Sequence, residues 1–285
     1  AGEGHCDVVI DLLSLGADIN AQSNGGWTPL LSAVFNGHCD VVIDLLSLGA
    51  DINAQNNEGY SALIIAALRD KTDVVVELVK GGADLDLQNK DGDSATIRAS
   101  YYGCTDVVVE LVKGGTNLDL QNKNGDSAVI SAIVEYKPAT LRELVRAGSD
   151  LNLQNQEGLT ALMIAVRSGR TDITNILLEG EHINLDIQEN GTGWSALHFS
   201  AERGDWDITQ ALLEAGASLH LKDKNGLTAM EIAGVKAEEG EEGRPYDKHR
   251  EERPQCNYEG VISLLREHCK EEPIATTSHH VSITL

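Results

Sequence analysis

The chain has 285 residues, enough for one large domain or two ordinary ones. Its 22 Lys and Arg against 45 Asp and Glu give a formal charge of −23, which excludes nucleic acids and anionic membrane surfaces as expected partners, because both repel so acidic a chain. No apolar run approaches the roughly 18 residues of a transmembrane helix, and five scattered cysteines indicate reduced thiols inside a cell rather than a disulfide framework.

A glycine recurs along the chain with a period of 33 residues, lengthened once to 35. It stands at Gly26, Gly59, Gly92, Gly125, Gly158, Gly193 and Gly226. Residues 4–22 recur unchanged at 37–55, which indicates that whole units were duplicated. A period of this length is typical of a solenoid built from stacked supersecondary units.

Each unit predicts a pair of short helices. Two residues after every periodic glycine stands a Ser or Thr that can cap a helix N-terminus, namely Thr28, Ser61, Ser94, Ser127, Thr160, Ser195 or Thr228. The helix that follows ends near a second glycine such as Gly37. The next helix carries apolar pairs one turn apart, as at 41–42 and 45–46, and these give it a single apolar face. Gly49 and its equivalents then end this second helix.

These motifs resemble the ankyrin repeat. That family's unit carries G-x-T-P-L-H, then G-H-x-x-V-V-x-L-L, then G-A-D-x-N, and residues 26–30, 37–42 and 49–53 match the three motifs well. The family's His survives only as His198. The resemblance covers residues 1–270 and implies an all-α, ankyrin-type helix-turn-helix solenoid with β-hairpin-like fingers, made of one half repeat and about seven repeats.

The spacing of the motifs divides the chain into a half repeat and seven full repeats. We expect the half repeat at 1–21 and full repeats at 22–54, 55–87, 88–120, 121–153, 154–188, 189–221 and 222–270. Two extra residues within 181–191 predict a longer finger. In the last repeat the first helix is expected to end near Val235, before a charge-rich insertion at 238–256. Residues 271–285 are expected to form a flexible tail.

The sequence carries no catalytic, cofactor or metal signature, so we expect no enzyme activity, no cofactor and no metal. The resemblance implies a non-enzymatic module that binds a partner peptide or helix in the concave ankyrin groove. Because Ala1 aligns with Val34, inside a first helix, we expect a fragment of a larger scaffold or adaptor. Alternatives are a substrate-selecting domain of a larger enzyme, or an inhibitor that masks a basic segment of its partner. The expected compartment is the cytoplasm, with the nucleus left open.

The predicted binding site follows repeat positions that the family turns toward its concave side. We expect partner contacts from Trp27, Phe35, Tyr60, Leu68, Tyr101 and Tyr102, with Arg69, Asp93 and Asp126 setting the polarity. Aromatic residues are favoured at interface hot spots. The alternative is that these rings only cover neighbouring helices. The partner is expected to be a protein with a basic or amphipathic segment.

Acidic residues recur at two positions of the second helix. One column stands in the first turn, where an acid favours the helix dipole. The other column contains Asp11, Asp44, Glu77, Glu110 and Glu143. A solvated outer face explains most of both columns, yet their charge would steer a basic partner toward the helical back of the array.

Two further sites are suggested by short motifs. Asn20, Asn53 and Asn152 end G-A-D-x-N-type motifs, eight residues after a leucine, which resembles the pattern used by the asparaginyl hydroxylase of hypoxia-inducible factor. The alternative is that Asn simply favours a turn. The last four residues, 282–285, are similar to a hydrophobic C-terminal ligand of a PDZ-type groove.

Overall fold

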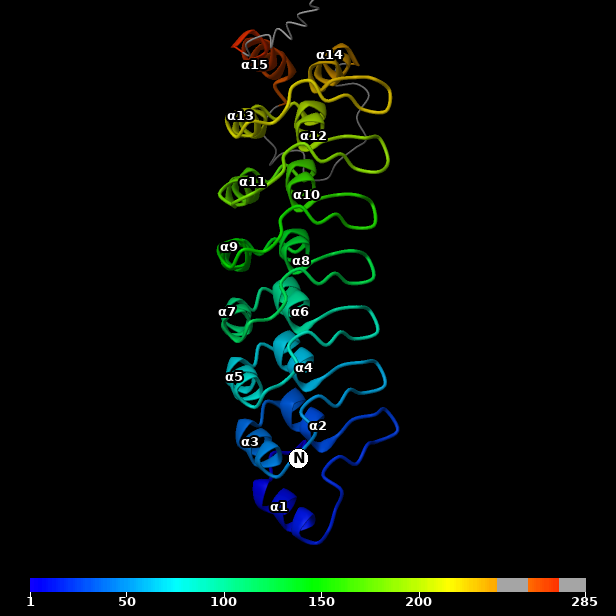
Figure 1. The fold of residues 1–285 in the computed structure, drawn as a ribbon, viewed down its shortest axis with the longest axis vertical. Coiled ribbons are helices and arrows are strands. Elements are labelled where there is room, and N and C mark those ends of the chain that lie inside the picture. The colour runs from blue at the N-terminus through cyan, green and yellow to red at the C-terminus, as the bar shows by residue number, and fades with distance from the viewer. Residues whose placement is uncertain (240–255, 272–285) are drawn as a thin grey trace, which may run out of the picture.

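The computed structural model describes residues 1–239 and 256–271 and shows a single stack of helix pairs (Figure 1). The first helices of the repeats form an inner column: α2 (Pro29–Asn36), α4 (Ala62–Leu68), α6 (Ala95–Tyr102), α8 (Ala128–Val134), α10 (Ala161–Arg167), α12 (Ala196–Arg203) and α14 (Ala229–Glu239). The second helices form an outer column: α1 (Cys6–Ser14), α3 (Cys39–Ser47), α5 (Thr72–Lys80), α7 (Thr105–Gly114), α9 (Pro138–Arg146), α11 (Thr171–Leu178), α13 (Trp206–Glu214) and α15 (Tyr258–Glu271).

The fingers project from the inner column, on the side away from the outer helices (Figure 1). The described residues contain no strand, and the hairpin character of the fingers is limited to isolated antiparallel bridges such as Gln55 with Ser61. The all-helical solenoid expected from the sequence is confirmed. None of the described helices combines the length and apolar composition needed to cross a membrane.

The inner helices begin at the predicted capping residues. The Thr28 hydroxyl accepts a hydrogen bond from the backbone N–H of Leu31 at 3.2 Å, and Ser61, Ser94, Ser127 and Thr160 repeat this bond. Ser195 uses a different cap, in which His198 Nδ1 lies 3.1 Å from the Ser195 backbone nitrogen. These bonds satisfy helix N–H groups that would otherwise lack partners.

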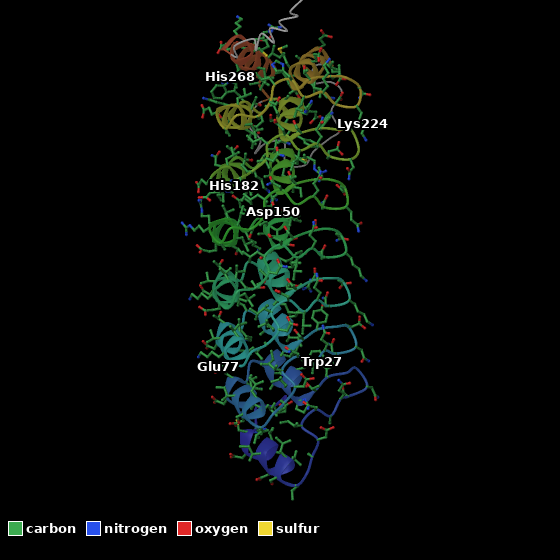
Figure 2. The ribbon with its side chains drawn as sticks, viewed as in Figure 1. Trp27, Glu77, Asp150, His182, Lys224 and His268 are labelled. Carbon is green, nitrogen blue, oxygen red and sulfur yellow. The ribbon has the colours of Figure 1, made fainter. Side chains whose placement is uncertain are left out.

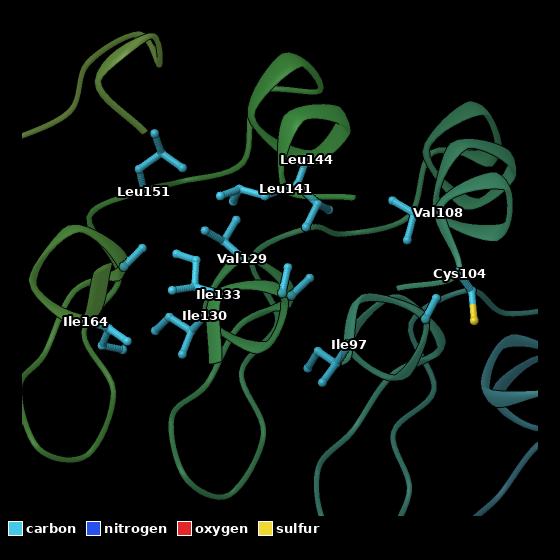
Figure 3. Close-up of a cluster of buried hydrophobic side chains, with 14 of the residues drawn as sticks. Ile97, Cys104, Val108, Val129, Ile130, Ile133, Leu141, Leu144, Leu151 and Ile164 are labelled. Carbon is cyan, nitrogen blue, oxygen red and sulfur yellow. The ribbon is translucent and has the colours of Figure 1, made fainter. Parts of the chain in front are cut away.

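The core is one continuous layer between the two helix columns. Figure 3 shows part of it, where Val129 and Ile133 of α8 lie toward Leu141 and Leu144 of α9. Each repeat buries its apolar residues against the next repeat, so no single repeat has a hydrophobic core of its own. None of the five cysteines, all of which lie within the described residues, forms a disulfide.

Glutamine side chains link successive fingers. Each donates from Nε2 to a carbonyl of its own finger and to a carbonyl of the following repeat. The second bond runs from Gln55 to Gln88, Gln88 to Gln121, Gln121 to Gln154, Gln154 to Gln188 and Gln188 to Lys222, at 2.8–3.2 Å. This ladder fixes the spacing between neighbouring fingers.

Two details differ from the sequence-based expectations. The two extra residues are divided: one lengthens the turn after α11, where His182 adopts a positive φ of 60°, and one lengthens the finger that Glu189 opens. The expected end of the last first helix near Val235 is wrong, because α14 continues to Glu239. No glycine or proline interrupts 235–239, and Lys236 pairs with Glu239 at 2.9 Å. Residues 240–255 of the insertion and 272–285 of the tail lie outside the described residues.

Candidate partner-binding face

Eight of the nine predicted contact residues lie in the first three full repeats, on the fingers and at the C-terminal ends of the inner helices. We call this surface, formed by Trp27, Phe35, Tyr60, Leu68, Arg69, Arg98, Tyr101 and Tyr102, the aromatic face. Figure 2 places Trp27 on the finger side of the array and Glu77 on the opposite side, among the outer helices. The aromatic face is divided into two clusters.

The first cluster joins the fingers and helices of the first two full repeats. The rings of Trp27 and Phe35 meet edge to face, with centroids 5.5 Å apart and an interplanar angle of 89°. The Arg69 guanidinium lies over the Phe35 ring, with Cζ 4.6 Å from its centroid. Phe35 nevertheless keeps 38% of its surface exposed. The ring is therefore held in place from two sides while one part of it faces solvent.

The second cluster is organised by Arg98 of α6. Its guanidinium contacts Asp93 Oδ2 at 3.3 Å, donates to the Tyr60 hydroxyl at 3.4 Å and lies over the Tyr102 ring with Cζ 5.5 Å from the centroid. Tyr101 and Tyr102 meet edge to face at 5.2 Å. A hydrogen bond to Glu135, and the charge of that carboxylate, raise the pKa of Tyr101. Both tyrosines stay well exposed, at 38% and 48%.

Two of the predicted polar residues do not lie on the aromatic face. Asp93 is only 6% exposed, and it accepts hydrogen bonds from Arg98 and from Asn122 Nδ2, the latter at 3.0 Å. Asp126 is half-buried one repeat further on, where burial raises its pKa and Asn155 Nδ2 donates to it at 3.4 Å. Both carboxylates tie one finger to the next. Leu68 is half-buried, so the exposed part of this surface consists mainly of rings and Arg69.

Sequence reasoning missed Arg98, the residue that holds the second cluster together. A usable signal was present, because the same repeat position is otherwise Ser or an apolar residue: Ser32, Ile65, Ser131, Ile164, Phe199 and Ile232. A guanidinium in that column requires a polar partner. Asp93 of the same finger and Tyr60 of the preceding one supply it.

The asparagines proposed for hydroxylation carry a second ladder between repeats. The side-chain Oδ1 of Asn20, Asn53 and Asn152 accepts the backbone N–H of Asp51, Asp84 and Asn184 at 2.8, 2.9 and 2.7 Å. Asp86 and Asp119 make the same contact in the intervening repeats. A structural role for these asparagines thus consists of accepting one backbone N–H of the next repeat. An Asp carboxylate accepts the same hydrogen bond.

The outer face carries the predicted acidic columns. First-turn acids occur in most outer helices, beginning with Asp7 and Asp40. In the second column, Glu77 pairs with Lys80 at 2.8 Å and Glu110 with Lys113 at 2.7 Å. Glu143 pairs in the same way with Arg146. Part of the negative charge is therefore neutralised within single helices, at exposed positions where such pairs contribute little stability.

No group of side chains in the described residues has a composition and spacing suited to a metal ion.

The sequence model described as "Ankyrin repeats (3 copies)" matches residues 1–89, 31–122, 63–154, 96–187 and 129–223. The chain belongs to the ankyrin repeat family. An ankyrin repeat domain is a general protein–protein interaction module. The solved ankyrin repeat domain of Bcl-3, a member of the IkappaB protein family, superposes with a TM-score of 0.70 at 25% identity. That alignment covers 85% of this chain and 100% of the Bcl-3 domain.

The curated relatives share only short stretches with this chain. The inhibitor of Bruton tyrosine kinase from Xenopus laevis is 32% identical over 69 residues, which are 24% of this chain and 5% of that protein. Ankyrin repeat and SAM domain-containing protein 6 from Mus musculus is 34% identical over 70 residues, or 25% of this chain and 8% of the relative. The human 2-5A-dependent ribonuclease is 37% identical over 71 residues, or 25% and 9%. The match thus spans less than a tenth of each of these relatives.

Proposed function

We propose that this ankyrin repeat domain binds an amphipathic segment of another protein on the aromatic face, as the recognition part of a larger scaffold or adaptor. The contacting residues are Phe35, Tyr101 and Tyr102, with Trp27, Tyr60 and Leu68 beneath or beside them. The partner's apolar side chains pack on these rings, and its polar side chains meet Arg69 and solvent. No residue of the domain performs chemistry in this role.

The observation that carries the proposal is the combination of exposure and fixed geometry. Phe35 is held by Trp27 and Arg69, and Tyr102 by Arg98 and Tyr101, while each ring leaves a large part of its surface uncovered. Rings that are already immobilised lose little side-chain entropy on binding. Exposed aromatic surface of this kind is typical of interface hot spots.

The acidic outer face supports a second candidate, the masking of a basic segment. Its first-turn acids extend from Asp7 to Asp207 along the outer helices. A basic partner bound there would depend strongly on salt, because exposed charges are screened. Substrate selection for a larger enzyme remains compatible with either surface, and one relative is named a ribonuclease.

Selection of peptides tests the proposal without a known partner. The whole chain is used to select binders from a random 16-residue peptide library displayed on phage, and the strongest binder is synthesised. In the double variant Phe35→Ala with Tyr101→Ala, we expect its Kd to rise about 30-fold, equivalent to roughly 2 kcal/mol of hot-spot contact. Fluorescence anisotropy measures the Kd at two salt concentrations.

The matched control removes apolar surface from the outer column. Ile43 and Leu48 are as exposed as the aromatic residues, at 42% and 52%, so Ile43→Ala with Leu48→Ala truncates comparable side chains elsewhere. This control should leave the Kd unchanged. Unchanged affinity in the Phe35 and Tyr101 variant, with its melting temperature preserved, would exclude the aromatic face. If binding then disappeared at high salt, the acidic outer face would be favoured.

A further inference from the structure

Arg69 occupies an unusual place in an acidic chain. No Lys or Arg precedes it in residues 1–68, which span the half repeat, the first full repeat and most of the first helix of the second. The fold places this guanidinium on the Phe35 ring, at the edge of the exposed aromatic surface. Arg69 is itself exposed and makes no ion pair with any residue that the structure describes.

Asp70, the acid next to Arg69 in the sequence, adopts a positive φ of 55° and forms no ion pair with Arg69 in the described part of the chain. Burial, followed by the charge of the Asp70 carboxylate, raises the pKa of the Cys104 thiol to about 11. Arg69 therefore keeps its charge without a carboxylate of its own.

The neighbouring cluster also has more donors than acceptors. In the later fingers, Asn122 Nδ2 donates to Asp93 and Asn155 Nδ2 donates to Asp126. The equivalent Asn89 Nδ2 is buried without a partner in the described part of the chain. The preceding finger offers Tyr60 at the position where those carboxylates stand. Arg98 Nε likewise has no acceptor.

We propose that the partner segment carries a carboxylate beside its apolar side chains, and that Arg69 receives this carboxylate. The inference rests on the proposed function, because it concerns the same face. An Asp or Glu of the partner would meet a guanidinium already oriented by Phe35, and the planar fork of Arg suits a two-oxygen acceptor. The adjacent apolar side chain would then pack on Phe35 and Tyr101. This assigns an acidic amphipathic partner to the aromatic face, in place of the basic one suggested by the net charge.

Arg98 shows why the carboxylate goes to Arg69. Both guanidinium groups stack on exposed rings of the same face, Phe35 for Arg69 and Tyr102 for Arg98. Arg98, however, already contacts the buried Asp93 at 3.3 Å. The positive charge of Arg98 is already balanced by Asp93, so a partner carboxylate there would add an excess negative charge. At Arg69 the same carboxylate would balance a positive charge that has no partner.

A double-mutant cycle tests this pairing with the phage-selected peptide. The selected pool should be enriched in Asp or Glu next to an aromatic or aliphatic residue. Arg69→Met keeps the length and apolar character of the side chain but removes its charge, and it should raise the Kd of the synthetic peptide about fivefold. Replacing the peptide's Asp or Glu by Asn or Gln should raise the Kd by the same factor. Because both changes remove one interaction, the two together should raise the Kd no more than either one alone.

The control is Arg146→Met, which removes an exposed guanidinium paired with Glu143 on the outer helix α9 and should leave the Kd unchanged. A selected pool without acidic enrichment, or full additivity of the two changes, would overturn the carboxylate assignment. If Phe35→Ala with Tyr101→Ala still raises the Kd about 30-fold while Arg69→Met has no effect, the proposed function stands and only the partner's charge is wrong. Failure to select any peptide would contradict both.

Discussion

The first three and the last two full repeats use the same positions in opposite ways. In the late repeats, the rings of Trp194 and Phe199 meet edge to face with centroids 5.2 Å apart, and Trp194 donates its Nε1 hydrogen to Asp223 at 3.2 Å. Just before them, Arg167 pairs with Glu157 at 3.6 Å. The Trp194 indole and the Arg167 guanidinium thus find partners within the array.

In the early repeats two such groups are left open. Trp27 has no hydrogen-bond partner for its indole nitrogen within the described residues, and Arg69 has no carboxylate. Phe35 and Tyr101 stand exposed where Glu202 and Arg167 stand later in the chain. The contrast shows that a solenoid can reserve one stretch of its surface for a partner while the same positions elsewhere serve its own stability.

The fingers give the largest predicted difference between the two regions. Gly59 has φ of 80°, and an added Cβ would lie 2.9 Å from Asn89 Cα in the next finger. Gly226 has a similar φ of 82° but nothing within 4 Å. Gly59→Ala should therefore cost roughly 3 kcal/mol of unfolding free energy, and Gly226→Ala about 1 kcal/mol, the strain of the backbone alone. Urea unfolding measures both.

This comparison isolates stacking between fingers from backbone strain, because both substitutions share the same φ region. Equal losses at the two glycines would mean that the early fingers do not pack as tightly as their contacts imply. Equal losses would also mean that close contact between fingers does not hold Trp27 and Tyr60 in place.

The two tryptophans offer a test of intermediate size. Trp194→Phe should destabilise the protein by about 1 kcal/mol, because it leaves the buried Asp223 without one of its donors. Trp27→Phe keeps a ring against Phe35 and removes no hydrogen bond, so its effect should stay within about 0.5 kcal/mol. Thermal unfolding of the two variants side by side measures the difference. A larger loss at Trp27 would show that the aromatic face serves the fold after all.

The last prediction concerns the acid dependence of stability. Burial would raise the pKa of Glu189, but hydrogen bonds from the Thr192 hydroxyl and from the backbone N–H groups of Gly191, Trp194 and Thr192 outweigh it and hold the pKa at about 2. Because this pKa lies below the ordinary value of 4.5, the carboxylate stabilises the fold above pH 4.5. That contribution is lost as the pH falls toward 2.

The early finger provides the matched comparison, because Asn56 makes the equivalent contacts without a titrating group. The stability difference between the parent chain and Glu189→Gln should shrink as the pH falls from 4.5 to 2, while Asn56→Ala should show a constant difference. Guanidinium unfolding at several pH values measures both. A constant difference for Glu189→Gln would mean that its carboxylate is not held by the finger.

The sequence by itself determined the architecture. Period, capping residues and apolar spacing predicted the repeats, because each helix and turn is encoded locally and each unit packs only on its neighbours. Of the predicted site residues, Trp27 contacts Phe35 and Tyr101 contacts Tyr102. Asp93 and Asp126 instead bind asparagines of the following finger. The end of α14 was misplaced, because the pattern of earlier repeats says nothing about a helix that continues past its usual stop.

Only the tertiary structure decided which side chains are free to meet a partner. Asp93 and Arg69 both look like charged residues of one surface in the sequence, yet Asp93 is buried against Arg98 and Arg69 stays unpaired on Phe35. The physical reason is that these contacts depend on distances that the repeat pattern does not give. Some lie within one finger, as Arg98 with Asp93, and others join different repeats, as Tyr60 with Arg98 and Asp93 with Asn122, 38 and 29 positions apart in the chain.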